Sequence, residues 1–195
     1  MDTNDMLFAA AKDGNLQNAR NAIRQGANVK ARDTSLMRCT PLRWASLYGH
    51  LEVAKLLVEN GADVNARDHR KGVAPLRWAV EHPEMVKLLI ENGAEVDATD
   101  DDGWTALLHA CTEGHLESAK ILIEHGANVN HANLTSRYTP LMATANYGQL
   151  GVAKLLLENG AEVNATNIEG HSALWMAVRF NHPEVANLLR GVGAV

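Results

Sequence analysis

The sequence has little of what secreted, membrane-spanning and nucleic-acid-binding proteins usually need. Its two cysteines, Cys39 and Cys111, cannot form a disulfide framework and fit a reducing compartment. Its apolar runs, such as residues 56–58, fall far short of the ~20 residues of a membrane span. No basic segment precedes an apolar one at the start of the chain, so no secretory signal is expected. Eighteen Lys and Arg residues against 23 Asp and Glu residues give a net charge of −5, which disfavours a general binder of nucleic-acid phosphates.

What the chain does contain is an ordinary globular composition, with 46% hydrophobic and 21% charged residues among 195. This composition excludes disorder along the whole length. A chain of this size would form one or two domains of about 150 residues, unless repeats change the count. We therefore expect a cytoplasmic protein that binds neither nucleic acid nor membranes.

Two sequence markers recur with the same period along the chain. Gly-Ala pairs return at intervals of 35, 32, 33, 34 and 33 residues, beginning at Gly26, Gly61, Gly93, Gly126, Gly160 and Gly193. A triplet of the Thr-Pro-Leu type keeps the same spacing, beginning at Thr40, Ala74, Thr105, Thr139 and Ser172. Self-similarity near 33 residues predicts a stacked array of repeats, so the length should not be read as a domain count.

The segment 40–68 shows what one repeat would form. Thr40 before Pro41 predicts a helix N-cap followed by proline at the first helical position, and Gly49 ends this short helix. A second helix is expected from about Leu51 to Glu59, with apolar residues on one side. A helix pair this short cannot bury its apolar side alone, so it must stack on its neighbours.

With its TPL…GH…V..LL..GA.VN pattern, the sequence resembles the ankyrin repeat family over roughly residues 5–195. The resemblance implies an all-α repeat solenoid, in which helix-turn-helix units are joined by β-hairpin or loop tips. It also implies a single ankyrin-repeat domain over residues 1–195, with capping repeats at both ends. The six units would span approximately residues 5–37, 38–71, 72–102, 103–136, 137–169 and 170–195.

The third unit departs from the pattern of the others. Between Ala79 and Glu84 it is two residues shorter than the second unit, and residues 81–83 replace the usual Gly-His turn. We expect a clipped inner helix at this place. Such irregularity favours a natural sequence over an idealised design. The alternative is a binder engineered or selected on an ankyrin scaffold.

The histidines raise the hypothesis of a metal-binding site, but their spacing along the sequence disfavours it. Four of them occupy turns at one per repeat: His50, His82, His115 and His182. Stacked repeats would separate them by about 10 Å, whereas a shared zinc ion needs bonds of about 2 Å. We therefore interpret them as turn residues that form hydrogen bonds. Three more histidines are expected to be solvated in the tips: His69, His131 and His171.

The sequence also predicts no catalytic residue, no metal and no cofactor. It holds no nucleophile elbow, phosphate-binding loop, dinucleotide fingerprint or zinc-protease motif. Cys111 occupies an inner-helix position that suits a small buried residue. The acidic run 100–102 lacks the glutamate at the twelfth position of a calcium loop. An enzyme or a small-ligand-binding protein is therefore the least favoured alternative.

Relatives in the ankyrin family typically hold a partner protein with the tips and the exposed side of the inner helices. The resemblance, together with a cluster of basic tip residues, gives a set that we call the predicted binding residues: Arg43, Trp44, Leu47, Tyr48, Arg70, Arg77, Trp78, Asp102, Trp104, Thr112, Glu113, Arg137, Tyr138, Asn146, Tyr147, His171, Arg179 and Phe180. Aromatic residues and arginine are the usual anchors of such interfaces. The sequence therefore predicts a monomeric module that binds a partner protein.

Packing inside the array is the alternative role for the aromatic members of this set. Trp104 and Tyr138 could pack against neighbouring tips, and the same alternative applies to Tyr48, Tyr147 and Phe180. Two further aromatics, Trp44 and Trp78, occupy equivalent positions and could stack on each other along the groove. Another tryptophan, Trp175, lies one position earlier and could donate a hydrogen bond through its indole N–H.

Charge is distributed unevenly along the first half of the chain. Basic residues collect in the first three units: Arg32, Arg38, Arg43, Arg67, Arg70, Lys71 and Arg77. Acidic residues follow directly: Asp100, Asp101, Asp102 and Glu113. We hypothesise a binding face that is basic at one end and acidic in the middle, which would steer a partner's association. The alternative is that these charges only keep the tips solvated.

Overall fold

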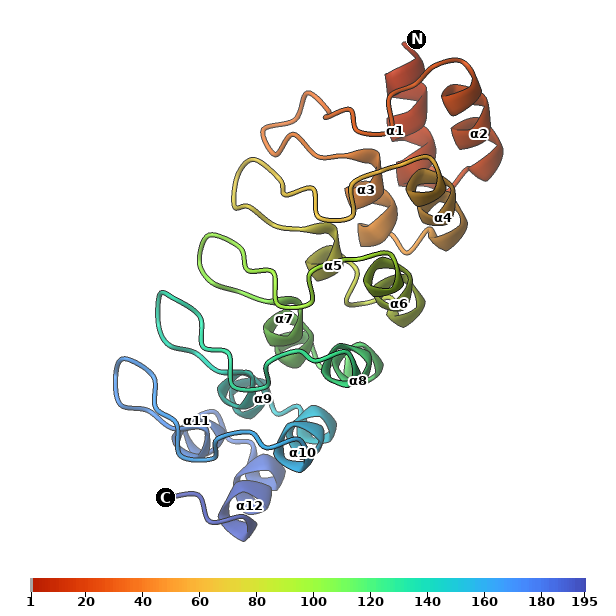
Figure 1. Cartoon of the computed structure of the whole chain (residues 1–195). Coiled ribbons are helices and arrows are strands. Elements are labelled where there is room, and N and C mark those ends of the chain that lie inside the picture. The colour runs from red at the N-terminus through yellow and green to blue at the C-terminus, as the bar shows by residue number, and fades with distance from the viewer. Residues whose placement is uncertain (1) are drawn as a thin grey trace. The chain divides into compact units, whose positions relative to one another are not determined.

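The computed structural model describes residues 2–195, which fold into a succession of helical hairpins joined by extended loops (Figure 1). These residues form twelve α-helices and no named strand. An isolated antiparallel bridge joins Thr166 to Ser172. Of the two tip conformations expected, loops rather than β-hairpins are therefore present. The chain divides into two compact units, one ending at Asp101 and the other running from Asp102 to Val195.

The first unit contains six helices: α1 (Thr3–Asp13), α2 (Leu16–Arg24), α3 (Pro41–Leu47), α4 (Leu51–Glu59), α5 (Pro75–Trp78) and α6 (Pro83–Glu91). The inner helix α3 packs against both α1 and α5, and the outer helix α4 packs against α2 and α6. Each inner helix also packs on its own outer helix. Stacking of neighbouring hairpins therefore buries the apolar sides that a single hairpin leaves exposed.

The second unit repeats this arrangement with α7 (Ala106–Glu113), α8 (Leu116–Glu124), α9 (Pro140–Tyr147), α10 (Leu150–Glu158), α11 (Ala173–Arg179) and α12 (Pro183–Gly191). The inner helix α9 lies between α7 and α11, and the outer helix α10 lies between α8 and α12. The leucine of each earlier triplet is at most 2% exposed: Leu42, Leu76, Leu107 and Leu141. These leucines form the centre of the core in both units.

The inner helices begin where the repeated triplets predict. The side chains of Thr40, Thr105, Thr139 and Ser172 each accept a hydrogen bond from the backbone N–H three residues later. Ala74 takes this position before α5 and offers no side-chain cap. The clipped helix predicted in the third repeat is confirmed, because α5 has only four residues. It lacks both a capping hydroxyl and the two residues that complete the last turn elsewhere.

Within each unit, side chains of the turns link neighbouring hairpins. The Nε2 atoms of His50, His82 and His182 contact the carbonyl oxygens of Lys12, Leu47 and Asn146 at 2.9, 3.3 and 2.9 Å. The interpretation of these three histidines as hydrogen-bonding turn residues is confirmed. Asparagines link the repeats in a similar way: Asn130 donates to the Gly160 carbonyl at 3.1 Å and accepts from the Glu162 N–H at 2.8 Å.

The expectation of solvated tip histidines is wrong for two of the three. His131 is half-buried, and its Nε2 atom contacts the carbonyl oxygen of Gly103 at 2.9 Å. His171 is half-buried because its ring stacks on Trp175, with centroids 3.5 Å apart. His69 is exposed, as expected. His131 thus gains a partner in a neighbouring tip, which the local sequence does not reveal.

Candidate functional site

Arg43 lies between two indole rings in the first unit. Its guanidinium carbon is 4.2 Å from the ring centroid of Trp44 and 4.3 Å from that of Trp78. The residue is 4% exposed, and its Nη2 atom contacts the sulfur of Met37 at 3.8 Å. This burial corrects the predicted placement of Arg43 on the exposed side of α3. The two tryptophans do not stack on each other either, because the guanidinium separates them.

Trp44 belongs to a partly exposed group on α1 and α3. Its ring stacks on Tyr48, with centroids 6.0 Å apart and an interplanar angle of 12°, and the Nζ atom of Lys12 lies 4.5 Å from its ring centroid. Tyr48 is 49% exposed, whereas Leu47 is half-buried. A cation and two aromatic rings therefore reach solvent together at this place, as an interface anchor would.

Asp33 fixes the orientation of the Trp44 indole. The indole N–H donates to Asp33 Oδ2 at 2.9 Å, and the Ser35 hydroxyl donates to Oδ1 at 2.6 Å. Burial opposes ionisation of this carboxyl group, but hydrogen bonds from Ser35, Trp44 and the Cys39 N–H outweigh burial and lower the pKa of Asp33. The tip before α3 is therefore held by an ionised carboxylate.

Much of the basic cluster is used to hold the tips of the first unit together. Arg77 forms an ion pair with the buried carboxylate of Asp100. Arg67 donates to the carbonyl oxygen of Thr99, and Arg32 donates to the carbonyls of Arg38 and Arg67, both at 2.9 Å.

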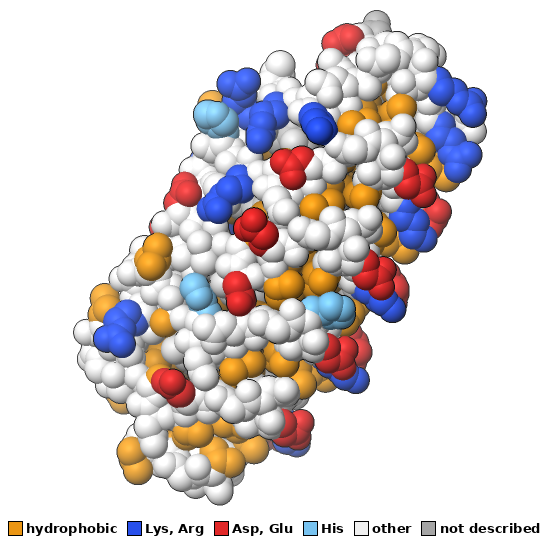
Figure 2. All heavy atoms as spheres, in the orientation of Figure 1, with side chains coloured by type: hydrophobic (Ala, Val, Ile, Leu, Met, Phe, Trp, Pro, Cys, Tyr) orange, Lys and Arg blue, Asp and Glu red, His pale blue; other side chains and the backbone are white. Residues whose placement is uncertain are grey.

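Arg70 is exposed at the tip before α5, and Figure 2 shows basic side chains gathered over the tips of the first unit. Arg43 is buried, and Arg77 is paired with Asp100 and only partly exposed. The exposed cluster is therefore smaller than the sequence suggests. The charge-steering hypothesis stays a prediction that now depends chiefly on Arg70 and its exposed neighbours in the tips.

The tips of the second unit bring Trp104 and Tyr138 together. Their ring centroids are 6.4 Å apart at an interplanar angle of 33°, and both residues are half-buried. Burial raises the pKa of the Tyr138 hydroxyl, which therefore stays neutral. The alternative of packing between neighbouring tips thus describes part of their surface. Arg137, next to Tyr138, is exposed with a φ of 56°, and Asp102 is half-buried.

The ends of the inner helices in the second unit carry exposed side chains. Tyr147 is 53% and Phe180 is 49% exposed. Arg179 is also exposed, and its guanidinium carbon lies 5.9 Å from the Phe180 ring centroid. Glu113 is exposed as well, whereas two neighbouring positions are half-buried: Thr112 and Asn146. The late inner-helix positions therefore present a mixed aromatic and charged surface.

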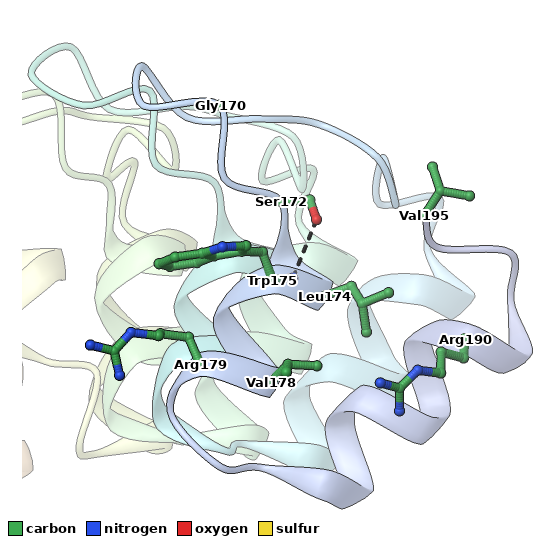
Figure 3. A pocket seen from close by; sticks show the side chains of 8 residues that line it. All are labelled: Gly170, Ser172, Leu174, Trp175, Val178, Arg179, Arg190 and Val195. Carbon is green, nitrogen blue, oxygen red and sulfur yellow. Dashed lines mark hydrogen bonds between the residues drawn. The ribbon is translucent and has the colours of Figure 1, made fainter.

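Two residues outside the predicted set are more exposed than their pattern suggests. Trp175 and Val178 lie on α11 (Figure 3), at positions that α7 and α9 of the same unit bury. The ring of Trp175 stacks on His171, a predicted binding residue, whose Nδ1 atom is 3.1 Å from Glu169. The character of these two side chains gives no sequence signal for their exposure.

Among the described residues we find neither a group of metal ligands nor an activated cysteine. Across residues 2–195, no group of three or more His, Cys, Asp or Glu side chains is placed to hold a metal ion. Burial raises the pKa of the Cys111 thiol, which keeps it protonated and unreactive. None of the helices in this part of the chain combines the length and the hydropathy that crossing a membrane would take.

Comparison with known proteins agrees with this geometry. The family model described as ankyrin repeats (3 copies) matches residues 2–68, 67–133 and 130–194. Among solved structures, the human ASB11 ankyrin repeat domain aligns with a TM-score of 0.86 at 33% identity, covering 97% of this chain and 84% of that one. The match extends over nearly the whole chain.

Plant proteins share the repeats at similar identity. The chain is 40% identical over 122 residues to the E3 ubiquitin-protein ligase XBAT32 of Arabidopsis thaliana, which covers 61% of this chain and 24% of that protein. It is 30% identical over 129 residues to the probable E3 ubiquitin-protein ligase XBOS32 of Oryza sativa subsp. japonica, covering 66% and 20%. The chain thus spans about a quarter or less of these relatives. The family match and the stacked helical hairpins together establish that this chain belongs to the ankyrin repeat family.

Proposed function

We propose that the chain is a non-enzymatic module that binds a partner protein through its tips and the exposed side of its inner helices. Ankyrin repeats are generally protein–protein interaction modules, and the helical hairpins described above have that fold. The observation that carries the proposal is the recurrence of half-exposed aromatic rings at the C-terminal ends of the inner helices, at Tyr48, Tyr147 and Phe180. These rings cover large apolar areas without filling a core, as interface anchors do.

The remaining predicted binding residues fit this proposal unequally. Trp44 extends the surface around Tyr48, and Arg179 extends the surface around Phe180. Lys12, which is outside the predicted set, lies over the Trp44 ring. In this proposal Arg43 does not contact the partner itself. Its buried guanidinium packs against the Trp44 ring and holds that ring in position. The partner surface that fits best is apolar with acidic residues, since the cations around these rings are solvent-facing.

The proposal also covers the domain organisation, the oligomeric state and the compartment of the module. We infer one monomeric domain of six repeats, with the unit boundaries that the sequence predicts. Two free, buried thiols, Cys39 and Cys111, suit a reducing compartment such as the cytoplasm. The plant relatives named as ubiquitin ligases match only over their repeats, so no ligase activity is proposed for this chain.

Affinity capture with a surface variant tests the proposal. The wild type and a triple variant (Tyr48→Ala, Tyr147→Ala, Phe180→Ala) would be used on source-cell lysate, and each captured protein would then be purified and titrated by calorimetry. Truncation of interface anchors typically weakens binding by ~1–2 kcal/mol or more each, so the triple variant should lose at least about tenfold in affinity.

A matched control distinguishes surface from stability effects. Leu116→Ala removes a 40% exposed apolar side chain from the outer helix α8, away from the inner-helix surface. Its binding should equal that of the wild type, and circular dichroism should show that all variants are helical. A purified partner that binds the triple variant as tightly as the wild type would overturn the proposal.

A further inference from the structure

Two neighbouring tips of the first unit carry exposed basic side chains. Arg38 lies in the tip of residues 33–39, and Arg70 lies beside the exposed Lys71 in the tip of residues 68–73. Among residues 2–195, the guanidinium groups of these two arginines form neither a hydrogen bond nor an ion pair. We call residues 33–39 and 68–73 together the basic tips; they lie in the region where Figure 2 shows basic side chains gathered.

Hydrogen bonds join the two basic tips to each other. The His69 N–H donates to the Met37 carbonyl oxygen at 2.8 Å. Arg32 donates to the carbonyl oxygens of Arg38 and Arg67, both at 2.9 Å. In Figure 1 the two loops follow one another on the same side of the helices of this unit. The two exposed arginines therefore belong to one surface.

The carboxylates of the basic tips are turned into their own loops. Asp33 Oδ1 accepts hydrogen bonds from the backbone N–H groups of Ser35 and Cys39 at 3.2 and 3.1 Å. Asp68 is 6% exposed, and its Oδ1 atom accepts from two N–H groups of its own loop at 3.2 and 3.0 Å. Each loop is thus closed by a carboxylate on its inner side, with cations on its outer side. Loops held in this way lose little conformational entropy when they bind.

Other charged groups near the basic tips have partners of their own. Arg67 donates to the carbonyl oxygen of Thr99. Asp101 is exposed, but its Oδ1 atom and the Arg67 Nη2 atom lie 2.5 and 3.0 Å from the Cβ position of Gly72, so the two charges offset each other. The acidic residues of α1 and its N-cap line a different hollow, together with Lys12. An excess of positive charge therefore remains with the two exposed arginines.

An apolar side chain is displayed next to this charge. Leu36 is 93% exposed and lines a shallow hollow of about 460 Å³ with Arg38 and residues 32–35. The Asp33 carboxylate also lines this hollow, but both of its oxygens accept hydrogen bonds, from the loop and from Trp44. An exposed leucine beside a cation is complementary to a segment that combines an apolar side chain with carboxylates.

We propose that the basic tips bind an acidic segment of the partner protein, whose carboxylates pair with Arg38 and Arg70 and whose apolar side chain contacts Leu36. This inference rests on the proposed partner-binding function and names the chemistry that the tips select. Arginine suits this role because its planar guanidinium holds a carboxylate through two parallel hydrogen bonds. The exposed rings late in the inner helices are a separate part of the partner surface.

Two synthetic peptides test this proposal on the full chain. One carries glutamates on both sides of a central leucine, and the other carries glutamine in place of every glutamate. Fluorescence anisotropy of labelled peptides should show that the glutamate peptide binds about tenfold more tightly than the glutamine peptide, or better. Raising the ionic strength from ~0.05 to ~0.5 M should weaken binding of the glutamate peptide, because salt screens exposed charges.

Charge reversal locates the site. Arg38→Glu/Arg70→Glu should weaken binding of the glutamate peptide about tenfold or more, and Leu36→Ala should weaken it severalfold. The control Arg20→Glu/Arg24→Glu changes the net charge by the same amount on the outer helix α2, where both arginines are exposed. This control should bind the peptide like the wild type, and circular dichroism should show that all variants are helical.

The triple ring variant described above separates this proposal from the one on which it rests. It should bind the glutamate peptide like the wild type, because it leaves the basic tips unchanged. A ring variant that keeps its captured partner would overturn the ring surface without changing the peptide result. The two proposals can therefore fail separately.

Several outcomes would overturn the binding of an acidic segment at the basic tips. Binding of neither peptide by the wild type is one, and equal binding of the two peptides is another. Equal losses in the tip variant and in the α2 control would mean that net charge alone attracts the peptide. A single-stranded oligonucleotide of the same charge supplies the last comparison. If it binds the tips more tightly than the glutamate peptide does, they bind nucleic-acid phosphates and the acidic protein segment is excluded.

Discussion

At the scale of single residues, the buried guanidinium of Arg43 is held by stacking. Its two neighbours are indole rings, and among the described residues its Nε and Nη1 atoms have no hydrogen-bond partner. A planar, delocalised cation can stack on aromatic rings in a way that an ammonium group cannot. The same repeat position is filled by Leu108 and Met142 in later repeats, so a buried apolar side chain is compatible with this slot.

We therefore expect Arg43→Lys to lower the free energy of unfolding more than Arg43→Met does. Lysine keeps a charge that must be desolvated but loses the stacked plane, whereas methionine fills the space without charge. The difference between the two variants should be ~1–2 kcal/mol in urea denaturation followed by circular dichroism. A lysine variant as stable as the wild type, beside a weakened methionine variant, would contradict the stacking interpretation.

Asp33 supplies a prediction about pH. Its pKa is lowered in the folded protein, so its stabilisation is fully present above the unfolded value of about 3.9 and is lost as the pH falls through the lowered folded value. Asp33→Asn keeps the shape but removes the acceptor for the Trp44 indole at 2.9 Å. Because a hydrogen bond to a charged group is lost, the variant should be less stable by more than ~1 kcal/mol at pH 7.

This difference should shrink as the pH falls below about 4, because the carboxyl group takes up a proton in the unfolded chain before it does so in the folded protein. Urea titrations at several pH values between 7 and 3 measure it directly. Serine at position 35 offers a control, since Ser35→Ala removes a donor to Asp33 and should show a weaker dependence of the same sign. A gap between wild type and Asp33→Asn that is constant with pH would mean that the carboxylate is not the stabilising group.

At the scale of elements, the turn between an inner and an outer helix packs against the next repeat. Gly148 has a φ of +72°, and a Cβ atom built on it would lie 2.5 Å from His182 Nδ1. Gly160 has a similar φ of +84°, but nothing lies within 4 Å of its Cβ position. The two glycines therefore share a left-handed backbone and differ in whether the next repeat packs against them.

Gly160→Ala should lower the free energy of unfolding by ~1–2 kcal/mol, through the left-handed backbone alone. Gly148→Ala should cost clearly more, because the new methyl group also displaces the His182 ring from the Asn146 carbonyl. In the double variant Gly148→Ala/His182→Ala the clash is absent, so the two effects should not add. The coupling is measured by thermal or urea unfolding of the wild type, Gly148→Ala, His182→Ala and the double variant. Simple additivity of the two single effects would show that the ring and the glycine act independently.

The elements that local chemistry determines could be predicted from the sequence. Thr40 and Pro41 fix the start of α3, and the expected second helix coincides with α4 at Leu51–Glu59. The clipped α5 follows from two missing residues in the same way. Capping groups, proline and glycine act over a few residues, so their effects can be read from a short segment.

Features that depend on the neighbouring repeat could not be predicted. Arg43 is buried because Trp78, 35 residues away, covers it, and His131 is half-buried because the Gly103 carbonyl lies beside it. These contacts cannot be predicted from the sequence of one repeat alone. The exposure of rings such as Tyr147 was therefore predicted correctly, and exposure was predicted wrongly where the next hairpin encloses the side chain, as at Arg43. That these residues bind a partner stays a prediction.

At the scale of the whole molecule, burial depends on the place of a residue in the array. Ala145 and Val178 occupy the same repeat position, but Ala145 is fully buried and Val178 is 54% exposed. In a stacked array each repeat contacts only its neighbours, and within residues 2–195 α11 has an inner-helix neighbour, α9, on one side only. The same substitution should therefore have very different effects at the two places.

Ala145→Glu should lower the free energy of unfolding by more than ~3 kcal/mol, because it buries an unpaired carboxylate between α9 and its neighbours. Val178→Glu should stay within ~0.5 kcal/mol of the wild type, since position 178 is 54% exposed and the new carboxylate reaches solvent. Urea denaturation followed by circular dichroism measures both values under the same conditions. A large loss of stability for Val178→Glu would contradict the exposure of this side chain in the folded protein.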